Sequence, residues 1–324
     1  MRRRPNLSGE RISEHMNLSQ LKTTRNPGVY SLSFDEYAAE PGINKGLLDD
    51  FAECPLAAYE TMTQGRLESI TEAMVFGQLA HAKISEPERF AEMYYLRPDF
   101  YPCKPTSADP RTEKPWTRAA KWCKEWLKTH SDRAAISSRE LVELEAVVAA
   151  IKAEPKAAQL FSVPGKYEQS LFGIDSETRL PMKGRPDYLP EESFLVDFKF
   201  TNDASLEAVS RSIVHMRYHV QAAIYFDLAN QAGRNVNAFY FVFVQRGERP
   251  RVNVRKLSNR GIDTGRAIYQ KQLCEFEDCL NSGEWPGPSG AGPDIDEVDI
   301  SDFEFNRVWM TPATLQIGTE KYAA

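Results

Sequence analysis

The sequence lacks long apolar runs, and none of its hydrophobic stretches approaches the roughly 20 residues that a membrane helix needs. The start Met-Arg-Arg-Arg is not followed by an apolar segment, so no secretory signal is expected. The five cysteines are scattered, and none lies in a C-x-x-C pair. These absences argue against a membrane protein, a zinc site built from cysteines and a disulfide framework. We expect the protein to work in a reducing cytoplasm.

Basic charge is also in short supply. Lys and Arg number 40 against 46 Asp and Glu, which gives a formal net charge of −6. Nucleic-acid-binding proteins usually carry a basic surface. A negative total does not exclude that class, because net charge conceals local patches and metal-dependent nucleases concentrate carboxylates at the site. The Walker A signature, G-x-x-x-x-G-K-[ST], is absent, so any activity is expected to be independent of ATP.

Composition divides the chain into three parts. Residues 1–30 are polar and basic, which predicts a flexible leader, with a DNA-contacting arm as the alternative. Residues 31–288 hold the helical and extended patterns of a folded domain. Residues 289–324 form a tail that is acidic in its first half.

Helical and extended patterns alternate within the predicted domain, which indicates an α/β fold with a mixed central sheet and a helical N-terminal part. Helices are predicted over 46–62, 67–84, 138–153 (capped by Ser138), 204–231 and about 260–283. Strands are predicted over 167–173, 180–189, 193–200, 236–244 and 251–257. A segment rich in Pro and Lys, 102–115, is expected to be a long loop, and a basic helix with three tryptophans follows it.

Two aspartates and a lysine lie close together in the sequence: Asp187, Asp197 and Lys199. In the strand predicted over 193–200, a period of two places Asp197 and Lys199 on one face and aromatic side chains on the other. A hairpin with strand 180–189 would bring Asp187 beside Asp197. Adjacent carboxylates repel each other, and a divalent cation relieves that repulsion. The alternative is a salt-bridged hairpin, since an acidic-x-Lys triplet alone is a weak motif.

Further residues extend this candidate site. Glu168 lies on the strand predicted upstream and is either a third carboxylate of the site or an exposed strand residue. His81 lies on a predicted helix, where a lone histidine is more often structural than a metal ligand. Tyr218, Gln221 and Tyr225 share one helical stripe by their spacing. That stripe either packs against the domain or lies beside the metal site, contacting DNA or orienting a catalytic group.

The order of these motifs resembles that of the RecE-type exonucleases (exodeoxyribonuclease VIII family), in the RecB-like branch of the PD-(D/E)xK nuclease superfamily. Four blocks carry the resemblance: Gly42–Tyr59, Phe76–Phe90, Gly184–Asp187 with Val196–Lys199, and Tyr218–Tyr225. The chain departs from the family in having Asn44-Lys45-Gly46 where Ser-Lys-Ser is common. No cysteine follows Trp285, so an iron–sulfur cluster is not expected.

The resemblance implies roles for the site residues. A divalent cation, Mg²⁺ with Mn²⁺ as a substitute, would be held by His81, Asp187, Asp197 and the Phe198 carbonyl. Lys199 would act on the attacking water. Gln221 and Tyr225 would support the site or the DNA strand.

The expected function is therefore Mg²⁺-dependent hydrolysis of DNA from double-stranded ends. The resemblance further implies 5′→3′ digestion that leaves 3′ single strands for an annealing protein in phage recombination, and a homo-oligomeric ring around DNA. Two alternatives stay open. One is a nuclease of the same fold that acts on single strands or flaps, and the other is a nuclease-fold protein that binds DNA without cutting it.

Overall fold

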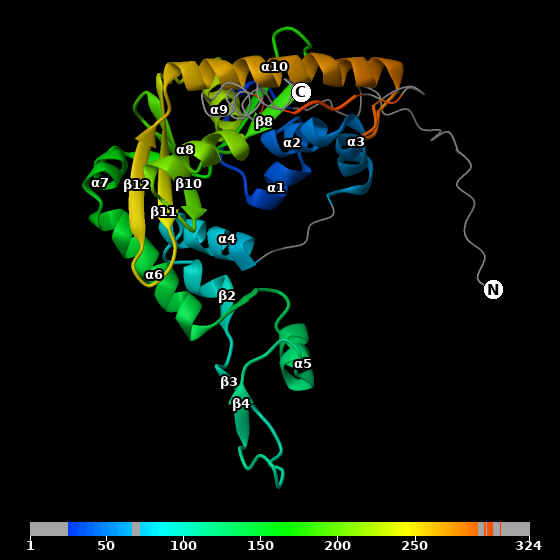
Figure 1. Ribbon diagram of the computed structural model, residues 1–324. Coiled ribbons are helices and arrows are strands. Elements are labelled where there is room, and N and C mark those ends of the chain that lie inside the picture. The colour runs from blue at the N-terminus through cyan, green and yellow to red at the C-terminus, as the bar shows by residue number, and fades with distance from the viewer. Residues whose placement is uncertain (1–24, 67–71, 291–294, 296, 301–304, 306–324) are drawn as a thin grey trace, which may run out of the picture. The chain divides into compact units, whose positions relative to one another are not determined.

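The computed structural model describes residues 25–66, 72–290, 295, 297–300 and 305 (Figure 1). The chain divides into two compact units, Met1–Trp285 and Pro286–Ala324. Most of the predicted leader and most of the predicted acidic tail lie outside the described residues. Within the described residues, no helix is both long enough and apolar enough to cross a membrane.

A mixed five-stranded sheet runs through the first unit in the order β12-β11-β10-β9-β6. Its strands are β6 (Gly165–Tyr167), β9 (Tyr188–Pro190), β10 (Phe194–Thr201), β11 (Ala238–Gln245) and β12 (Arg251–Lys256). β10 and β11 are parallel, and the other neighbours are antiparallel. A parallel pair needs a long crossover, and two helices supply it here. The mixed central sheet expected from the sequence is confirmed.

A second sheet of three strands has the order β1-β7-β8, with β1 (Gly28–Tyr30), β7 (Ser170–Ile174) and β8 (Pro181–Gly184). β1 falls in the segment predicted to be a flexible leader. That prediction is wrong for these three residues, which pair with β7 in antiparallel register and bring Val29 against the core. Three residues are too few to show a strand periodicity in the sequence.

The single strand predicted over 180–189 is also wrong, because the chain changes sheet at Arg185-Pro186. β8 belongs to the three-stranded sheet and β9 to the five-stranded sheet. Proline has no N–H to donate to a ladder, so pairing stops there. The strand predicted over 167–173 is likewise divided between two sheets at Glu168, whose φ is 53°.

Helices make up most of the rest of the described chain: α1 (Phe34–Ala39), α2 (Lys45–Glu53), α3 (Pro55–Gln64), α4 (Glu72–Ser85), α5 (Lys121–Thr129), α6 (Ser138–Ala153), α7 (Pro155–Ser162), α8 (Leu206–His215), α9 (Tyr218–Gln231) and α10 (Asn259–Ser282). Two predicted helices are each broken in two. Pro55 cannot continue α2, so it begins α3. Arg217, in the left-handed region at φ 53°, separates α8 from α9.

The helix predicted over 138–153 is confirmed, but its N-cap is Ser137 rather than Ser138. The Ser137 hydroxyl accepts from the Glu140 backbone N–H, and the Glu140 carboxylate accepts from the Ser137 backbone N–H. This reciprocal capping box satisfies two backbone donors that a helix start otherwise leaves unpaired.

The segment between α4 and α6 holds short elements that the sequence did not predict. They are the 3₁₀ helix Phe90–Glu92, β2 (Tyr94–Leu96), β3 (Phe100–Pro102), β4 (Glu113–Pro115) and β5 (Ala134–Ile136). β2 and β5 pair in parallel, and β3 and β4 form an antiparallel hairpin around the expected loop.

Both faces of the five-stranded sheet are buried, which makes the unit a layered α/β structure (Figure 1). Phe239, Phe241 and Phe243 of β11 pack with α2, α9 and α10 in one core. Val196 and Phe198 of β10 pack with α4, α6 and α7 in the other. Because side chains alternate along β10, its two charged residues face the α9 side.

Close packing of α9 against α10 depends on Gly265. A Cβ at this position would clash with the carbonyl oxygen of His219. Alanine gains about 0.8–1.0 kcal/mol of helix propensity over glycine, whereas overpacking costs about 1–3 kcal/mol. Because the clash is with backbone atoms, the overpacking cost falls at the upper end of this range, and we expect Gly265→Ala to lower the free energy of unfolding by about 2 kcal/mol in urea denaturation. Gly77→Ala is the control, because the described atom nearest to its new Cβ lies 3.9 Å away on Phe200. Equal effects of the two substitutions would contradict this packing.

Candidate functional site

β10 carries Asp197 and Lys199 to the sheet face that α9 covers. Asp197 is 1% exposed, and the Lys199 Nζ lies 2.5 Å from its Oδ2. This buried ion pair explains how a carboxylate persists in the core, since an unpaired buried charge is strongly disfavoured.

The stripe predicted on α9 reaches this ion pair. The Lys199 Nζ donates to Gln221 Oε1 at 2.8 Å, and Gln221 Nε2 donates to Asp197 Oδ1 at 3.2 Å. Gln221 Nε2 also lies 3.1 Å from the Tyr225 hydroxyl. The Lys199 ammonium stands 4.4 Å from the centre of the Tyr218 ring. One amide therefore holds both charged groups in place, and an aromatic face supports the lysine.

Tyr225 is buried behind the ion pair. Its ring packs against Gly184, where a Cβ would come within 2.6 Å of a Tyr225 ring carbon. Burial raises the pKa of Tyr225 well above its usual value, and the nearby Tyr37 and Asp197 add to that effect. The phenol is therefore neutral, and the structure places it as a hydrogen-bonding support for Gln221.

Asp187 follows Pro186, where the chain passes from the three-stranded to the five-stranded sheet, and its side chain reaches β10. Its Oδ2 accepts a hydrogen bond of 2.6 Å from the Phe198 N–H. The N–H and C=O of one strand residue point to the same edge, so the Phe198 carbonyl is also directed to the Asp187 side. Burial raises the pKa of Asp187 well above its usual value, and the charges of Asp197 and Glu168 raise it further.

Glu168 occupies the turn between β6 and β7 in the left-handed conformation, with φ 53°. Its backbone N–H donates to the Asp187 carbonyl at 3.0 Å, and its Oε2 accepts from Arg185 Nε at 2.8 Å. Arg185 also donates to Ser170 Oγ and to the Leu32 carbonyl. Burial raises the pKa of Glu168, although Arg185 lowers it. Arg185 is a site residue that was not expected from the sequence, where its only signal is its position two residues before Asp187.

His81 approaches the same carboxylates from α4. Its Nδ1 lies 3.6 Å from Asp187 Oδ1 and 4.0 Å from Glu168 Oε1. Its ring contacts Phe198 and Phe200 edge-on, at centroid distances of 5.8 and 5.4 Å. Burial lowers the pKa of His81 to about 4, although Asp197 raises it. The imidazole is therefore neutral at pH 7, which is the form that ligates metals.

Ligand atoms of His81, Glu168 and Asp187 lie within 4.8 Å of one another. One nitrogen and carboxylate oxygens are a donor set that suits divalent cations such as Mn²⁺ and Mg²⁺. The raised pKa of Asp187 also reflects carboxylate repulsion that a cation would relieve. The residues therefore fit a divalent metal. Glu168, which the sequence left open, joins this cluster, whereas Asp197 lies beside it in the ion pair with Lys199.

A groove of about 280 Å³ opens at the carboxyl end of β10. Its lining includes polar and charged side chains, among them Lys199, Thr201, Asn202, Tyr218 and Arg246. Ligands of α/β sheets commonly bind at the carboxyl ends of strands. Lys199 therefore lines an opening at this end of the sheet.

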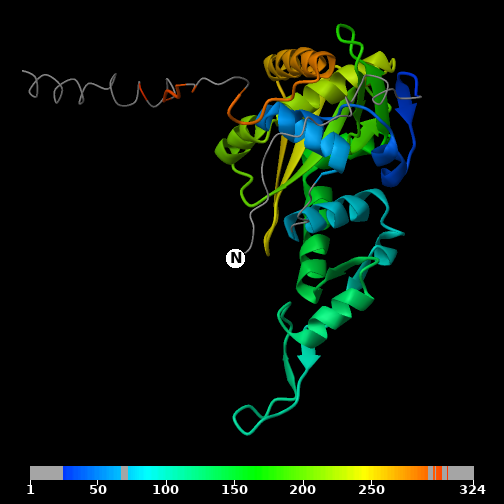
Figure 2. The same cartoon turned by 90° about the vertical axis from the view of Figure 1, so that its right-hand side faces the viewer.

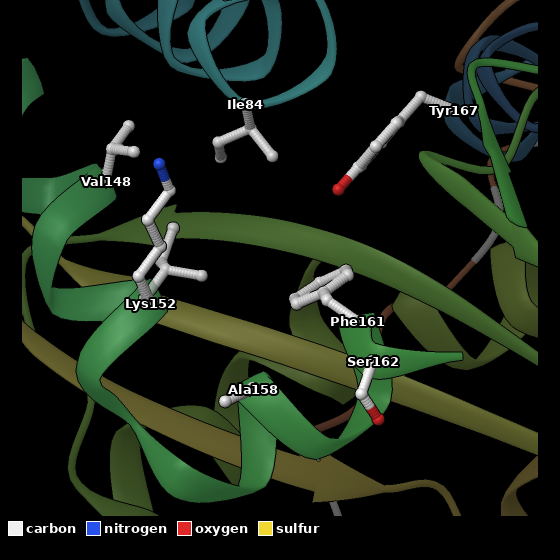
Figure 3. A pocket seen from close by; sticks show the side chains of 8 residues that line it. Ile84, Val148, Lys152, Ala158, Phe161, Ser162 and Tyr167 are labelled. Carbon is white, nitrogen blue, oxygen red and sulfur yellow. The ribbon is translucent and has the colours of Figure 1, made fainter. Parts of the chain in front are cut away.

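A separate cavity of about 250 Å³ lies among residues of α4, α6, α7 and β6 (Figure 3). Ile84, Val148 and Phe161 contribute apolar walls, and the Tyr167 hydroxyl points inward. None of its described lining residues carries a carboxylate, so this cavity does not offer the metal ligands of the His81 cluster.

A family model and one solved structure agree with this fold. A family model described as "PDDEXK-like domain of unknown function (DUF3799)" matches residues 46–295. None of the curated proteins matches the sequence significantly. A solved "putative exonuclease" from Eubacterium rectale is similar in structure, with a TM-score of 0.56 and 12% identity over 85% of this chain and 98% of that chain. The protein SSO0001 has a TM-score of 0.25 and 13% identity over 43% of this chain and 63% of that chain.

Proposed function

Because the chain belongs to the PDDEXK-like domain family, which places it in the PD-(D/E)xK nuclease superfamily, we propose that it hydrolyses DNA phosphodiester bonds with a divalent cation. The observation that carries this proposal is the convergence of His81, Glu168 and Asp187 beside the buried pair of Asp197 and Lys199. A metal-binding acidic cluster next to a lysine can activate water and stabilise charge on a phosphate, as phosphodiester hydrolysis requires. The "putative exonuclease" with the same fold supports the choice of reaction class.

In the proposed mechanism, the residues of the site have different tasks. His81, Glu168 and Asp187 would hold the cation, and Asp197 and Phe198 lie beside this cluster. The cation, when bound, supplies charge stabilisation to the phosphate and acidifies water. Lys199, which lines the groove, orients the attacking water and stabilises charge that develops on the phosphate. Gln221 holds the Lys199 ammonium and the Asp197 carboxylate in position through its two amide hydrogen bonds.

We further propose that the enzyme is an exonuclease of the RecE type that digests double-stranded ends 5′→3′ without ATP. The order of the four sequence blocks supports this choice. We also propose that an annealing protein is the partner that receives the resulting 3′ strand, and that the enzyme forms a ring-shaped homo-oligomer. Mg²⁺ is the proposed metal, with Mn²⁺ as a substitute.

A time course on linear duplex DNA, labelled at either the 5′ or the 3′ end, tests this function. With Mg²⁺, the 5′ label is expected in mononucleotides at the earliest times, while the 3′ label stays on long fragments. Closed circular DNA is the control and is expected to stay intact. Rapid cutting of the circle would exclude a strict exonuclease. Preferred cleavage of single strands or flaps would favour a nuclease of the same fold that acts on those substrates. Tight DNA binding without cleavage or metal binding would favour a binding protein.

A further inference from the structure

The segment from Arg97 to Arg133 differs in charge from the rest of the chain. It holds nine Lys and Arg against five Asp and Glu, whereas the whole chain has a net charge of −6. Everything outside this segment is therefore more acidic than the total suggests. We call residues 94–136, from β2 to β5, the arm.

A row of lysines lies on the outer side of α5 in the arm. Lys121, Lys124 and Lys128 are spaced by three and four residues, so they share one helical face, and all three are exposed. Trp122 and Trp126 occupy the other side of the helix. The surplus charge is thus displayed as a stripe.

An aromatic cluster holds this helix in place. The Trp126 ring stacks on His130 with centroids 4.0 Å apart, and it meets Trp116 edge-on at 5.4 Å. Trp126 also contacts Tyr95 of β2, and the Arg97 guanidinium stands 5.3 Å from the Trp116 ring centre. These contacts anchor α5 to β2 through its tryptophan side and leave the lysine side to solvent.

Charges at the tip of the β3–β4 hairpin are engaged within the hairpin itself. Arg111 and Lys114 both pair with Asp109, at 2.8 and 3.1 Å. By contrast, the only acidic group paired with the α5 stripe among the described ion pairs is Glu125, at 3.9 Å from Lys121 with both side chains exposed. Such an exposed pair contributes little. The α5 stripe is therefore a part of the arm that stays available to an external polyanion.

We propose that the α5 lysine stripe binds the phosphate backbone of the duplex DNA on which the protein acts. This inference rests on the proposed nuclease function for the identity of the polyanion. Both views draw α5, β3 and β4 on the side of β2 away from the five-stranded sheet (Figures 1 and 2). Lysines act as point charges, so the stripe contributes affinity without base recognition. Because the rest of the chain carries a net negative charge, a local basic surface of this kind favours DNA binding at physiological salt.

The test is binding of a fluorescent linear duplex to the full chain in a chelator, so that no cleavage occurs. We expect Lys124→Glu/Lys128→Glu to weaken binding by about 10-fold or more and to reduce the slope of log affinity against log salt by about two. Lys256→Glu/Lys271→Glu, at exposed positions on β12 and α10, makes the same change in net charge and is expected to stay near wild type.

Equal weakening of binding by both double variants would indicate a net-charge effect and overturn the proposal. Unchanged binding by the α5 double variant would overturn it as well. Lys124→Gln/Lys128→Gln, checked by circular dichroism, guards against misfolding and is expected to weaken binding less but in the same direction. Failure of the nuclease proposal has a different signature, because wild-type protein would then bind DNA through α5 yet leave it uncut when Mg²⁺ is supplied.

Discussion

Replacement of Lys199 by glutamine is expected to lower the rate of DNA cleavage by about 100- to 1,000-fold, the usual effect of losing one preorganised donor to the developing charge. The ammonium lies 2.5 Å from Asp197 and lines the groove at the carboxyl end of β10. Asp197→Asn should reduce the rate by a similar factor. Single-turnover cleavage of linear duplex at saturating metal measures both effects. Wild-type rates in either variant would contradict the assigned roles.

Glutamine and asparagine are preferable to alanine at these two positions. Removal of one partner from a buried ion pair typically destabilises a protein by about 3–5 kcal/mol, which could abolish activity through unfolding. Both amides can keep a hydrogen bond to Gln221. Lys183→Gln is the matched control, because Lys183 is another buried lysine and donates to the Tyr37, Ala38 and Glu40 carbonyls instead. It should reduce stability but leave the cleavage rate of folded protein unchanged.

Replacement of Asp187 by asparagine is expected to abolish stabilisation by metal without harming the metal-free fold. Asparagine keeps an acceptor for the Phe198 N–H but loses the charge that a cation needs. The pKa of Asp187 is raised by burial and by Asp197 and Glu168, so ionisation disfavours the metal-free native state. The native state therefore binds more protons than the unfolded state. The contribution of this carboxyl to the free energy of unfolding decreases as the pH rises above the ordinary pKa of aspartate. The Asp187→Asn substitution would remove that loss.

Thermal unfolding with and without MnCl₂ measures this prediction. A ligand at 100 times its dissociation constant stabilises the native state by about 2.7 kcal/mol. Wild type and the exposed-site control Asp278→Asn should show this gain, and Asp187→Asn should show little or none. Equal metal stabilisation of all three proteins would place the cation elsewhere.

The sequence was sufficient for the local geometry of the site. Alternation along residues 193–200 correctly put the two charged residues of β10 on one face, and helical spacing correctly grouped Tyr218, Gln221 and Tyr225. Both patterns depend on one element alone, so they can be read without knowing the partners. Their assigned roles stay predictions.

The contacts between distant segments of the site were harder to predict from the sequence. The hairpin expected to bring Asp187 to β10 is present as the antiparallel pair of β9 and β10, but its first strand begins only at Tyr188, because the chain changes sheet at Pro186. Glu168 faces the cluster because of a left-handed turn and an ion pair with Arg185, neither of which has a periodic signature. The meeting of His81 with these carboxylates depends on how α4 packs on the finished sheet. Three-residue strands such as β1 and β2 are too short for pattern recognition.

The most direct test of the central claim is the single-turnover cleavage rate of linear duplex as a function of Mg²⁺ concentration, for wild type and Asp187→Asn side by side. If the His81, Glu168 and Asp187 cluster holds the catalytic cation, the wild-type rate rises from zero in chelator to a plateau, and the variant stays at background across the same range. Cleavage by wild type in chelator, or a variant curve that overlays the wild-type curve, would contradict the account.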